Sequence, residues 1–266
     1  MTSQAASAAA PAAPVTLVTG AASGIGEAAV RLFAERGHRV VAVDVQEEGL
    51  AKLGTLDGLA TLVGDVSEES TNTAAVELAL ERFGRLDAAV LNAGIGGAGP
   101  LESPGAIERF DRLFAVNVRS VALGIRAAAP ALRASGGGSI VATSSVSGLR
   151  GDPGTWGYNA TKAAVINLVR ATAIDYAAQN IRVNAIAPGG TATALTAGQT
   201  ADPDFSAAIT GRIPAHRWSE PREQAEVIWF LTSPAASYVT GVTVPVDGGL
   251  SANGGILPPP PGPAAH

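Results

Sequence analysis

Short runs of apolar residues alternate with longer segments of helical spacing over most of the chain. The short runs are rich in Val, Ile and Leu and are bounded by turn-forming residues, which is typical of strands buried on both faces. Because helical segments separate these runs, we expect parallel strands joined by right-handed crossovers. The pattern predicts an α/β protein with a doubly wound, seven-stranded parallel sheet and helices on both faces, with strands at 15–19, 39–44, 59–64, 86–91, 139–143, 181–187 and 242–246.

Helical spacing fills the gaps between the predicted strands. In the first gap, Ala29, Leu32, Phe33 and Arg36 recur at helical intervals, and Gly37 ends the pattern. Longer helices are predicted near 68–83, 106–134, 157–178 and 220–232.

The two ends of the chain differ from this pattern. Residues 1–14 are mainly Ala, Ser, Thr, Gln and Pro, and residues 258–266 are rich in Pro. Neither segment carries enough large apolar side chains to offset the entropy lost on ordering. We therefore expect a single domain at 15–257 between two flexible tails.

The amino-acid composition excludes several classes of protein and of binding partner. Hydrophobic residues make up 47% of the chain and charged residues 15%, which suits a large core and excludes a disordered protein. The net charge of −5, without a cluster of Lys or Arg, argues against a nucleic-acid partner. No apolar stretch is long enough to span a membrane, and residues 1–14 lack the Lys or Arg of a secretory signal. The absence of cysteine excludes disulfides and thiol nucleophiles, so we expect a cytoplasmic protein without a membrane partner.

The first predicted strand runs directly into a glycine-rich turn, from Thr19 to Gly26, and a helix follows. Glycine permits a tight turn and lets backbone N–H groups approach a pyrophosphate, to which a helix N-terminus adds partial positive charge. An ordinary strand–helix turn is the alternative, but this position between strand and helix is the one that the dinucleotide-binding motif requires. The turn predicts a Rossmann-type dinucleotide site with contacts from Gly20, Ser23, Gly24, Ile25 and Gly26.

Polar residues close the next three strands. Asp44 ends the second strand, where a carboxylate can accept hydrogen bonds from both adenosine ribose hydroxyls and would repel a 2′-phosphate. No Lys or Arg follows within seven residues, so NAD is the expected cofactor, favoured over NADP by roughly 2–3 kcal/mol. Further cofactor contacts are expected where the third and fourth strands end, from Asp65, Val66, Asn92, Ala93 and Gly94.

Tyr158 and Lys162 lie four residues apart at the start of a predicted helix, and therefore on one face of it. A free tyrosine has a pKa of about 10, but a nearby ammonium and an oxidised nicotinamide both favour the phenolate. Such a phenolate could take a proton from an alcohol as hydride leaves its carbon. The bare spacing also occurs on ordinary surface helices, so the prediction depends on its combination with the cofactor turn.

With these motifs, the chain resembles the short-chain dehydrogenase/reductase family, in its subgroup with the compact cofactor turn, over about residues 14–250. The family pattern Thr-Gly-x-x-x-Gly-x-Gly is matched from Thr19 to Gly26. The family serine usually stands thirteen residues before the tyrosine, which selects Ser145 over Ser144. The other family motifs are matched by Asn92-Ala93-Gly94, Asn117, Pro188-Gly189, Thr193 and the Val-Asp-Gly-Gly at 246–249.

The resemblance implies roles for these residues. Ser145 would hold the substrate oxygen, and Lys162 would bind the nicotinamide ribose and lower the pKa of Tyr158. Asn117 would hold a water molecule that links the lysine to solvent. Thr191 stands where the family usually has an aliphatic residue, so its nicotinamide contact is the least typical among Pro188, Gly189, Thr191 and Thr193.

Two kinds of related enzyme are excluded by their family patterns, which this chain lacks. Sugar-nucleotide epimerases typically carry two rather than three residues after the first glycine, and enoyl reductases place the tyrosine and lysine six residues apart. Three alternatives remain open beside a secondary alcohol dehydrogenase. An acyl-carrier-protein ketoreductase usually lacks an acid at the position of Asp44. A noncatalytic NAD-binding regulator would be expected to lose Ser145, Tyr158 or Lys162, and an isomerase would return NAD unchanged.

Two further features surround the expected site. The helix after Lys162 is apolar almost all round, which favours its burial between copies of the chain. The resemblance implies that these copies form a homotetramer, or otherwise a homodimer. Residues 192–217 are expected to form a mobile lid that excludes water. Apolar residues in the lid, with Leu149 and Trp156 near the tyrosine, suggest a bulky secondary alcohol or ketone. His38, His216 and His266 lack metal-ligand spacing, so no metal is expected.

Overall fold

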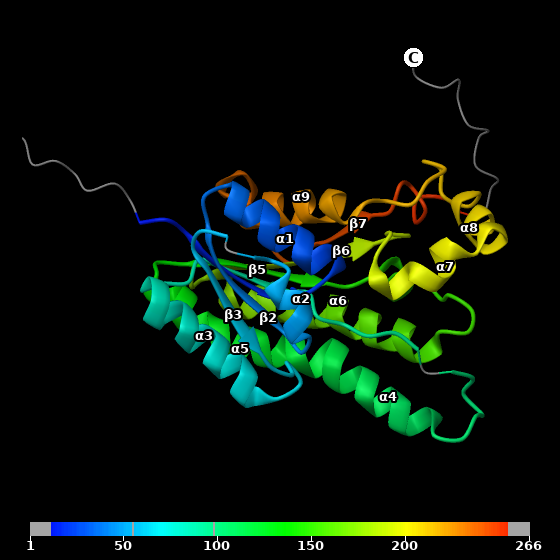
Figure 1. The fold of residues 1–266 in the computed structure, drawn as a ribbon, viewed down its shortest axis with the longest axis horizontal. Helices are drawn as coiled ribbons and strands as arrows, with labels where there is room; N and C mark the ends of the chain where they lie inside the picture. The colour runs from blue at the N-terminus through cyan, green and yellow to red at the C-terminus, as the bar shows by residue number, and fades with distance from the viewer. Residues whose placement is uncertain (1–11, 55, 98, 255–266) are drawn as a thin grey trace, which may run out of the picture.

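The computed structural model describes residues 12–254 except 55 and 98, so the predicted tail at 258–266 and most of that at 1–14 lie outside the described residues. All seven strands run parallel in the order β3-β2-β1-β4-β5-β6-β7, which confirms the predicted sheet (Figure 1). The strands are β1 (Val15–Thr19), β2 (Arg39–Asp44), β3 (Leu59–Val63), β4 (Ala88–Leu91), β5 (Gly138–Thr143), β6 (Ile181–Pro188) and β7 (Thr243–Val246).

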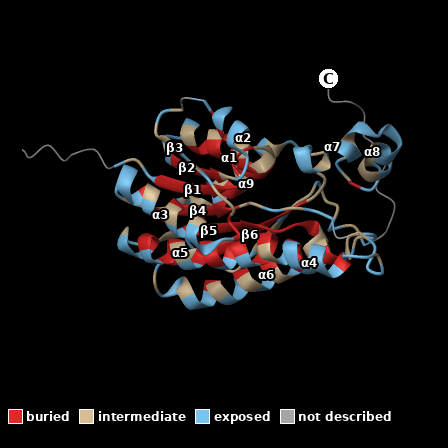
Figure 2. Cartoon of the chain, turned by 60° about the horizontal axis from the view of Figure 1, so that its bottom comes forward, coloured by how far each residue is buried: buried red, intermediate tan, exposed pale blue. Residues whose placement is uncertain are grey.

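Helices cover both faces of the sheet because successive strand residues point to opposite sides. Val18 of β1 packs in the cluster formed with α1 (Gly24–Glu35) and α9 (Pro221–Thr232). Its neighbour Leu17 packs in the other cluster, with α3 (Glu69–Phe83), α5 (Ser120–Ala134) and α6 (Trp156–Ala177). Figure 2 shows the buried strands between the partly exposed helices. No helix in the described ranges is both long enough and apolar enough to cross a bilayer.

The prediction of a single α-helix at 106–134 is wrong. It consists of α4 (Ala106–Phe114), a π-helical turn η1 (Ala115–Arg119) and α5. A π turn inserts one residue into the helical ladder without removing the apolar spacing, so the sequence pattern does not reveal it. The turn contains Asn117, whose side chain makes two hydrogen bonds with the backbone of Ile95 in the loop after β4. Its amide oxygen accepts one, and its amide nitrogen donates the other.

Several short helical segments were not expected because they are too short to show a periodic pattern. They are α2 (Glu47–Ala51), η2 (Val146–Gly148), η3 (Ala194–Thr196), α7 (Ala197–Ala201), α8 (Pro203–Thr210) and η4 (Pro234–Ala236).

The strand order reverses between β1 and β4, which are neighbours although two strands separate them in sequence. In doubly wound sheets a crevice forms at such a point, outside the carboxyl ends of the strands, and ligands bind there. The glycine-rich turn after β1 and the loops after β4 and β5 all start at this edge. The topology therefore brings together most of the residues that the sequence singled out.

Candidate active site

The glycine-rich turn is packed tightly against the loop that follows β4. A Cβ atom added to Gly20, which has a φ of 65°, would lie 2.8 Å from the Cα of Ala93. A Cβ on Gly26 would lie 1.9 Å from the carbonyl oxygen of Gly20. Only glycine fits these contacts, and α1 begins at Gly24 with its free N–H groups toward the turn. The turn therefore has the shape and polarity that a pyrophosphate requires.

Asn92 holds this turn to two strands. Its amide nitrogen donates to the carbonyl oxygens of Thr19 and Gly20 at 3.2 and 3.3 Å. Its amide oxygen accepts a hydrogen bond from the hydroxyl of Thr143 at 3.0 Å. The side chain expected to touch the cofactor is thus engaged within the protein, which leaves the backbone of residues 92–94 to face the crevice.

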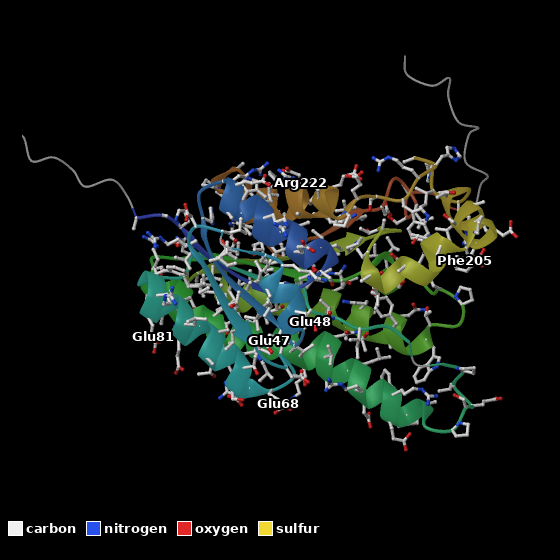
Figure 3. All side chains as sticks on the ribbon, viewed as in Figure 1. Glu47, Glu48, Glu68, Glu81, Phe205 and Arg222 are labelled. Atoms are coloured by element: carbon white, nitrogen blue, oxygen red, sulfur yellow. The ribbon has the colours of Figure 1, made fainter. Side chains whose placement is uncertain are left out.

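The carboxylate of Asp44 closes the turn from the side of β2. One of its oxygens accepts a hydrogen bond from the backbone N–H of Ala22 at 2.9 Å, and the other accepts from Gln46 at 3.0 Å. Each carboxylate oxygen keeps a second lone pair, so the group can still accept from ribose hydroxyls. Glu47 and Glu48 follow at the start of α2 and add negative charge nearby (Figure 3).

Asp65 is tied to the helix that leads to Asn117. It accepts hydrogen bonds from the backbone and hydroxyl of Ser67, and its other oxygen pairs with Arg112 at 2.9 Å. Burial raises the pKa of Asp65, but the bonds from Ser67 and Arg112 outweigh this effect, and the net pKa is lowered. Arg119 also donates to the carbonyl oxygen of Ser67. The predicted adenine site, with buried Val66 between these residues, is therefore fixed to α4 and η1.

Lys162 is only 3% exposed, and its ammonium donates to the carbonyl oxygen of Thr143 at 2.9 Å. Its Nζ lies 5.6 Å from the centroid of the Tyr158 ring, as the helical spacing predicts. Burial lowers the pKa of Lys162 to about 8, because few groups compensate for the lost hydration of the charge.

Tyr158 departs from the sequence expectation in one respect. Its pKa is raised rather than lowered, mainly because burial disfavours the phenolate; a hydrogen bond with Ser145 opposes this effect, and the charge of Asp152 adds to it. The expected lowering depended partly on an oxidised nicotinamide, which supplies positive charge beside the phenol. In the chain alone, burial therefore outweighs the hydrogen bond with Ser145.

Ser145 is placed beside Tyr158 by η2, which packs directly on α6. Ser145 is the N-cap of η2, and its oxygen accepts from the backbone N–H of Ser147 at 3.1 Å. A Cβ on Gly148 would lie 2.6 Å from the backbone carbon of Lys162, so glycine lets the two elements approach. The neighbouring hydroxyl, on Ser144, donates to the carbonyl oxygen of Lys162 and is not available to a substrate.

Asn117 joins three elements of the site. Its amide nitrogen donates to the carbonyl oxygen of Ile95 and to the hydroxyl of Thr161, and its amide oxygen accepts from the N–H of Ile95. A Cβ on Gly94 would lie 3.2 Å from the ammonium of Lys162 and 3.3 Å from the amide oxygen of Asn117. The side chain holds the loop after β4 over the lysine; the water expected between Asn117 and Lys162 stays a prediction.

The loop after β6 begins where Gly189 packs on Asp247, since a Cβ there would lie 2.7 Å from that side chain. Preceding it, Pro188 pairs with Val246 of β7. Farther along, Thr193 reaches back to the cofactor turn, because a Cβ on Gly24 would lie 3.1 Å from its methyl group. The predicted nicotinamide loop therefore lies opposite the N-terminus of α1.

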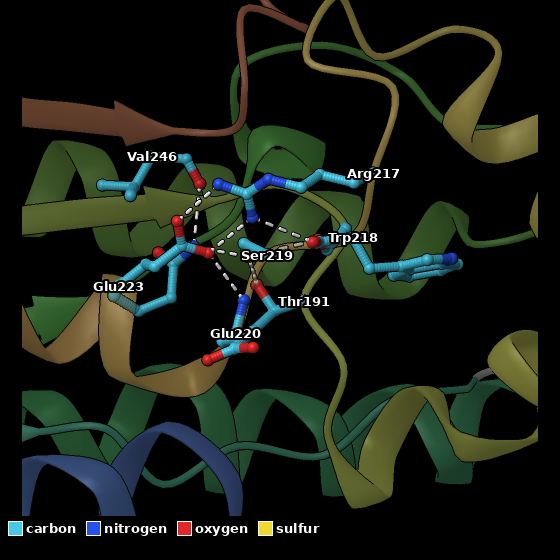
Figure 4. Close-up of polar contacts among 9 residues, drawn as sticks. Thr191, Arg217, Trp218, Ser219, Glu220, Glu223 and Val246 are labelled. Atoms are coloured by element: carbon cyan, nitrogen blue, oxygen red, sulfur yellow. Dashed lines mark hydrogen bonds and ion pairs between the residues drawn. The ribbon is translucent and has the colours of Figure 1, made fainter. Parts of the chain in front are cut away.

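Thr191 has a structural reason to be polar. It accepts a hydrogen bond from Ser219 at 2.9 Å, inside a network that also includes the bidentate Arg217–Glu223 pair (Figure 4). The hydrogen bonds from Arg217, with one from the backbone of Glu220, lower the pKa of Glu223 to about 2. This network joins the end of the lid to α9, so Thr191 contributes to anchoring the lid.

The expected lid is made of η3, α7 and α8, with Leu195 and Phe205 exposed (Figure 3). Ile213 is buried instead, against Gly190 and Gly248. Leu195 extends toward Gly96, where a Cβ would lie 3.5 Å from its methyl carbon. The expected lid thus crosses toward the loop after β4, and Ile213 is buried near its end, whereas Arg212 and Arg217 are exposed.

Sequence reasoning missed residues that contact the predicted site. Thr143, Ser147 and Asp152 lie beside the predicted catalytic residues, and Arg112 and Arg119 lie beside Asp65 and Ser67. No short motif marks them, because each contacts a residue on another element. The one available signal was a lone acid, Asp152, in the Gly-rich segment between the serine and the tyrosine.

A parallel sheet with a glycine-rich turn at its switch point and a Ser–Tyr–Lys group beside it defines a nicotinamide-dependent oxidoreductase. A family model described as enoyl-(acyl carrier protein) reductase matches residues 20–251. Together with the relatives below, this match shows that the chain belongs to the short-chain dehydrogenase/reductase family. Its tyrosine and lysine are four residues apart, unlike the six expected of enoyl reductases.

Similar proteins match nearly the whole chain. A cis-4-hydroxycyclohexanecarboxylate dehydrogenase of Sinomonas cyclohexanicum is 42% identical, over 90% of this chain and 96% of its own. The levodione reductase of Leifsonia aquatica is 41% identical, over 90% of this chain and 94% of its own. A 3-ketoacyl-(acyl-carrier-protein) reductase from Brucella melitensis, solved with NADH, is 38% identical, with a TM-score of 0.82 over 90% of this chain and 99% of its own.

Proposed function

We propose that this chain is an NAD-dependent oxidoreductase that interconverts a bulky or cyclic apolar secondary alcohol and its ketone. The observation that carries the proposal is the group formed by Tyr158, Ser145 and Lys162. The phenol is hydrogen-bonded to Ser145, lies one helical turn from a buried ammonium, and stands at the sheet edge where the glycine-rich turn begins.

The crevice suits a nicotinamide dinucleotide, as the close contacts of Gly20 and Gly26 indicate. When bound, the oxidised nicotinamide supplies a hydride acceptor and a positive charge near Tyr158. Lys162 would hold the nicotinamide ribose, and Asp44 the adenosine ribose. The remaining contacts would come from Ser23, Gly24, Ile25, Asp65, Val66, Ala93, Gly94, Pro188, Gly189, Thr191 and Thr193.

Tyr158 is the proposed general acid and base. In the oxidation direction its oxygen takes the proton from the substrate hydroxyl; in the reduction direction it returns the proton to the carbonyl oxygen. Ser145, which is hydrogen-bonded to the phenol in the chain alone, would donate a hydrogen bond to the same substrate oxygen once the substrate is bound. The ammonium of Lys162 stabilises the phenolate, and Asn117 holds the loop that covers the lysine.

We assign NAD rather than NADP because of the charges around Asp44. Its carboxylate stands at the end of β2, and Glu47 and Glu48 follow it. A 2′-phosphate would meet these negative charges, and no Lys or Arg follows Asp44 within seven residues to offset them. The NADH in the solved ketoacyl reductase from Brucella melitensis supports this choice.

The proposed substrate is apolar and bulky because exposed apolar side chains lie on segments next to the predicted site. Leu149 follows η2 and Leu195 lies in η3, and both are exposed. Trp156, two residues before Tyr158, lies with its ring 5.2 Å from that of Phe110 of α4. The names of the Sinomonas and Leifsonia relatives, a hydroxycyclohexanecarboxylate dehydrogenase and levodione reductase, support a cyclic substrate. A 3-oxoacyl-(acyl-carrier-protein) reductase is the second candidate, favoured by the likeness to the Brucella enzyme.

A substrate panel tests the proposal. Cyclic secondary alcohols, short polar alcohols and a 3-hydroxyacyl thioester would each be supplied with NAD or NADP, and NADH or NADPH formation followed by absorbance. We expect net NADH from the cyclic alcohols. Activity confined to the thioester would favour the second candidate, and activity confined to short polar alcohols would contradict the substrate class. Conversion of substrate without net NADH would instead identify an isomerase.

We also propose that the protein forms a homotetramer and is located in the cytoplasm. Val165, Ile166 and Val169 of α6 are buried within the protomer, so they need no partner to cover them. Ile174 on the same helix is 80% exposed, and Tyr238 is fully exposed. Large exposed apolar side chains favour association with further copies. A cytoplasmic location would give the enzyme a shared pool of NAD.

A further inference from the structure

Asp152 lies between the two elements that carry the catalytic hydroxyls. Its carboxylate accepts a hydrogen bond from the hydroxyl of Ser147 at 2.6 Å. The backbone N–H of Ser147 in turn donates to the oxygen of Ser145 at 3.1 Å. A chain of two hydrogen bonds therefore joins the carboxylate to the proposed substrate-binding serine.

The backbone of Asp152 is joined to the helix of Tyr158. Its carbonyl oxygen accepts from the side chain of Asn159 at 2.9 Å and from the hydroxyl of Thr155 at 3.2 Å. Thr155 is the N-cap residue of α6, and Asn159 follows Tyr158 directly. The same residue thus contacts both the turn of the serine and the first turn of the tyrosine helix.

We propose that Asp152 is a positioning residue for the catalytic pair, acting on Ser145 through Ser147 and on Tyr158 through the start of α6. The inference rests on the proposed function of Tyr158 and Ser145. The backbone N–H of Ser147 occupies one acceptor position of the Ser145 oxygen, and the hydroxyl proton, which faces the phenol in the chain alone, would be donated to a bound substrate oxygen. By holding Ser147, the carboxylate fixes the direction of that donation.

The charge of Asp152 also acts on the phenol. Its negative charge raises the pKa of Tyr158, in addition to the larger effect of burial. The other charged groups nearby are Lys162, 5.6 Å from the ring, and Arg150, whose Nε lies 3.5 Å from the carboxylate. The facing loops at 92–97 and 192–196 contain no ionisable side chain. Among the described residues, Asp152 is the carboxylate whose charge contributes to the raised pKa of the phenol, beside the larger effect of burial.

Two substitutions separate the two effects. Asp152→Asn removes the charge but keeps an oxygen that can accept from Ser147. We expect the acid limb of the pH profile of kcat/KM for alcohol oxidation to move to lower pH, with the plateau kcat within about twofold. Ser147→Ala keeps the charge and removes the hydrogen bond. We expect the plateau kcat to fall about three- to tenfold, with the limb unchanged, as loss of one positioning hydrogen bond implies.

The controls make the outcome decisive. Asp175→Asn is the same substitution at the exposed end of α6, and its profile should match the parent. Phenolate absorbance of the NAD-free protein, after subtraction of the Tyr158→Phe spectrum, should show a lower midpoint in Asp152→Asn. This titration does not need turnover, so an inactive parent would overturn the proposed function alone. Unchanged phenolate midpoint and pH profile in Asp152→Asn, or unchanged kcat in Ser147→Ala, would overturn the inference.

Discussion

The ammonium of Lys162 donates to the carbonyl oxygen of Thr143 at 2.9 Å, at the end of β5, which β4 separates from the strand of the cofactor turn. Thr143 in turn donates through its hydroxyl to Asn92, which holds Thr19 and Gly20. The proposed catalytic lysine and the predicted pyrophosphate site are therefore joined by one network of hydrogen bonds. A shift of either would disturb the other.

The buried lysine should make the stability of the cofactor-free protein rise with pH. Its pKa is about 8 in the folded chain, below the ordinary value of 10.5, so the folded state binds fewer protons between these values. From pH 8 to 10 this group should add about 2 kcal/mol to the free energy of unfolding. The raised pKa of Tyr158 opposes this trend only above pH 10.

Denaturant unfolding of the parent, Lys162→Met and Lys52→Met measures this contribution. Lys52→Met, at an exposed position, should leave the pH dependence of the free energy of unfolding unchanged. Lys162→Met should remove its rise between pH 8 and 10. A parallel rise in Lys162→Met and the parent would show that the lysine keeps an ordinary pKa when folded.

Tyr158→Phe should abolish turnover while leaving dinucleotide binding intact. The ring keeps its packing, but no group remains to take the substrate proton, and such a group contributes roughly 10²–10⁴-fold in rate. NADH fluorescence would measure binding, and the substrate panel would measure kcat. Tyr176→Phe on the same helix serves as the matched control. Full activity in Tyr158→Phe would contradict the mechanism.

Asp44→Ala should weaken the preference for NAD. Removal of the carboxylate eliminates repulsion of a 2′-phosphate, and the ratio of kcat/KM for NAD over NADP should fall about 30- to 150-fold, which corresponds to about 2–3 kcal/mol. Some stability is also lost, since Asp44 accepts from Ala22 and Gln46. The ratio is insensitive to that loss. Glu81→Ala, on the outer surface of α3, should leave the ratio unchanged (Figure 3).

Arg112→Gln should raise the KM for NAD about two- to fivefold with little change in kcat. The ion pair with Asp65 is partly exposed, so its contribution is of the size measured for surface pairs. Arg126→Gln removes a similar exposed pair, with Glu69, away from the crevice and should leave the KM unchanged. Equal effects of the two substitutions would argue against a cofactor role for Asp65.

Ile174→Glu should reduce the size of the assembly. A carboxylate at this exposed position on α6 would be costly to bury against a second copy, whereas it is fully hydrated in the monomer. Light scattering at micromolar concentration would compare it with Ala163→Ser, a mild change on the same helix. A parent that is already monomeric would contradict the tetramer.

The sequence was sufficient for the sheet and for the shape of the glycine-rich turn because those signals are local. Strand bounds such as 15–19 follow from apolar runs, and the turn from Thr19 to Gly26 needs glycine for its own backbone. The four-residue spacing of Tyr158 and Lys162 fixes their shared face on any α-helix. These features depend on neighbours within one or two turns of the chain.

The tertiary structure alone decided the direction of the Tyr158 pKa, the engagement of Asn92 and the π turn at Asn117. Each depends on atoms from elements far apart in sequence: burial under several loops, the carbonyl of Thr19, and the backbone of Ile95. Hydrogen bonding and desolvation are set by which groups meet in space, and apolar periodicity carries no information about that. The sequence therefore determined which chemical groups the site contains, and the packing determined which of them remain free to act.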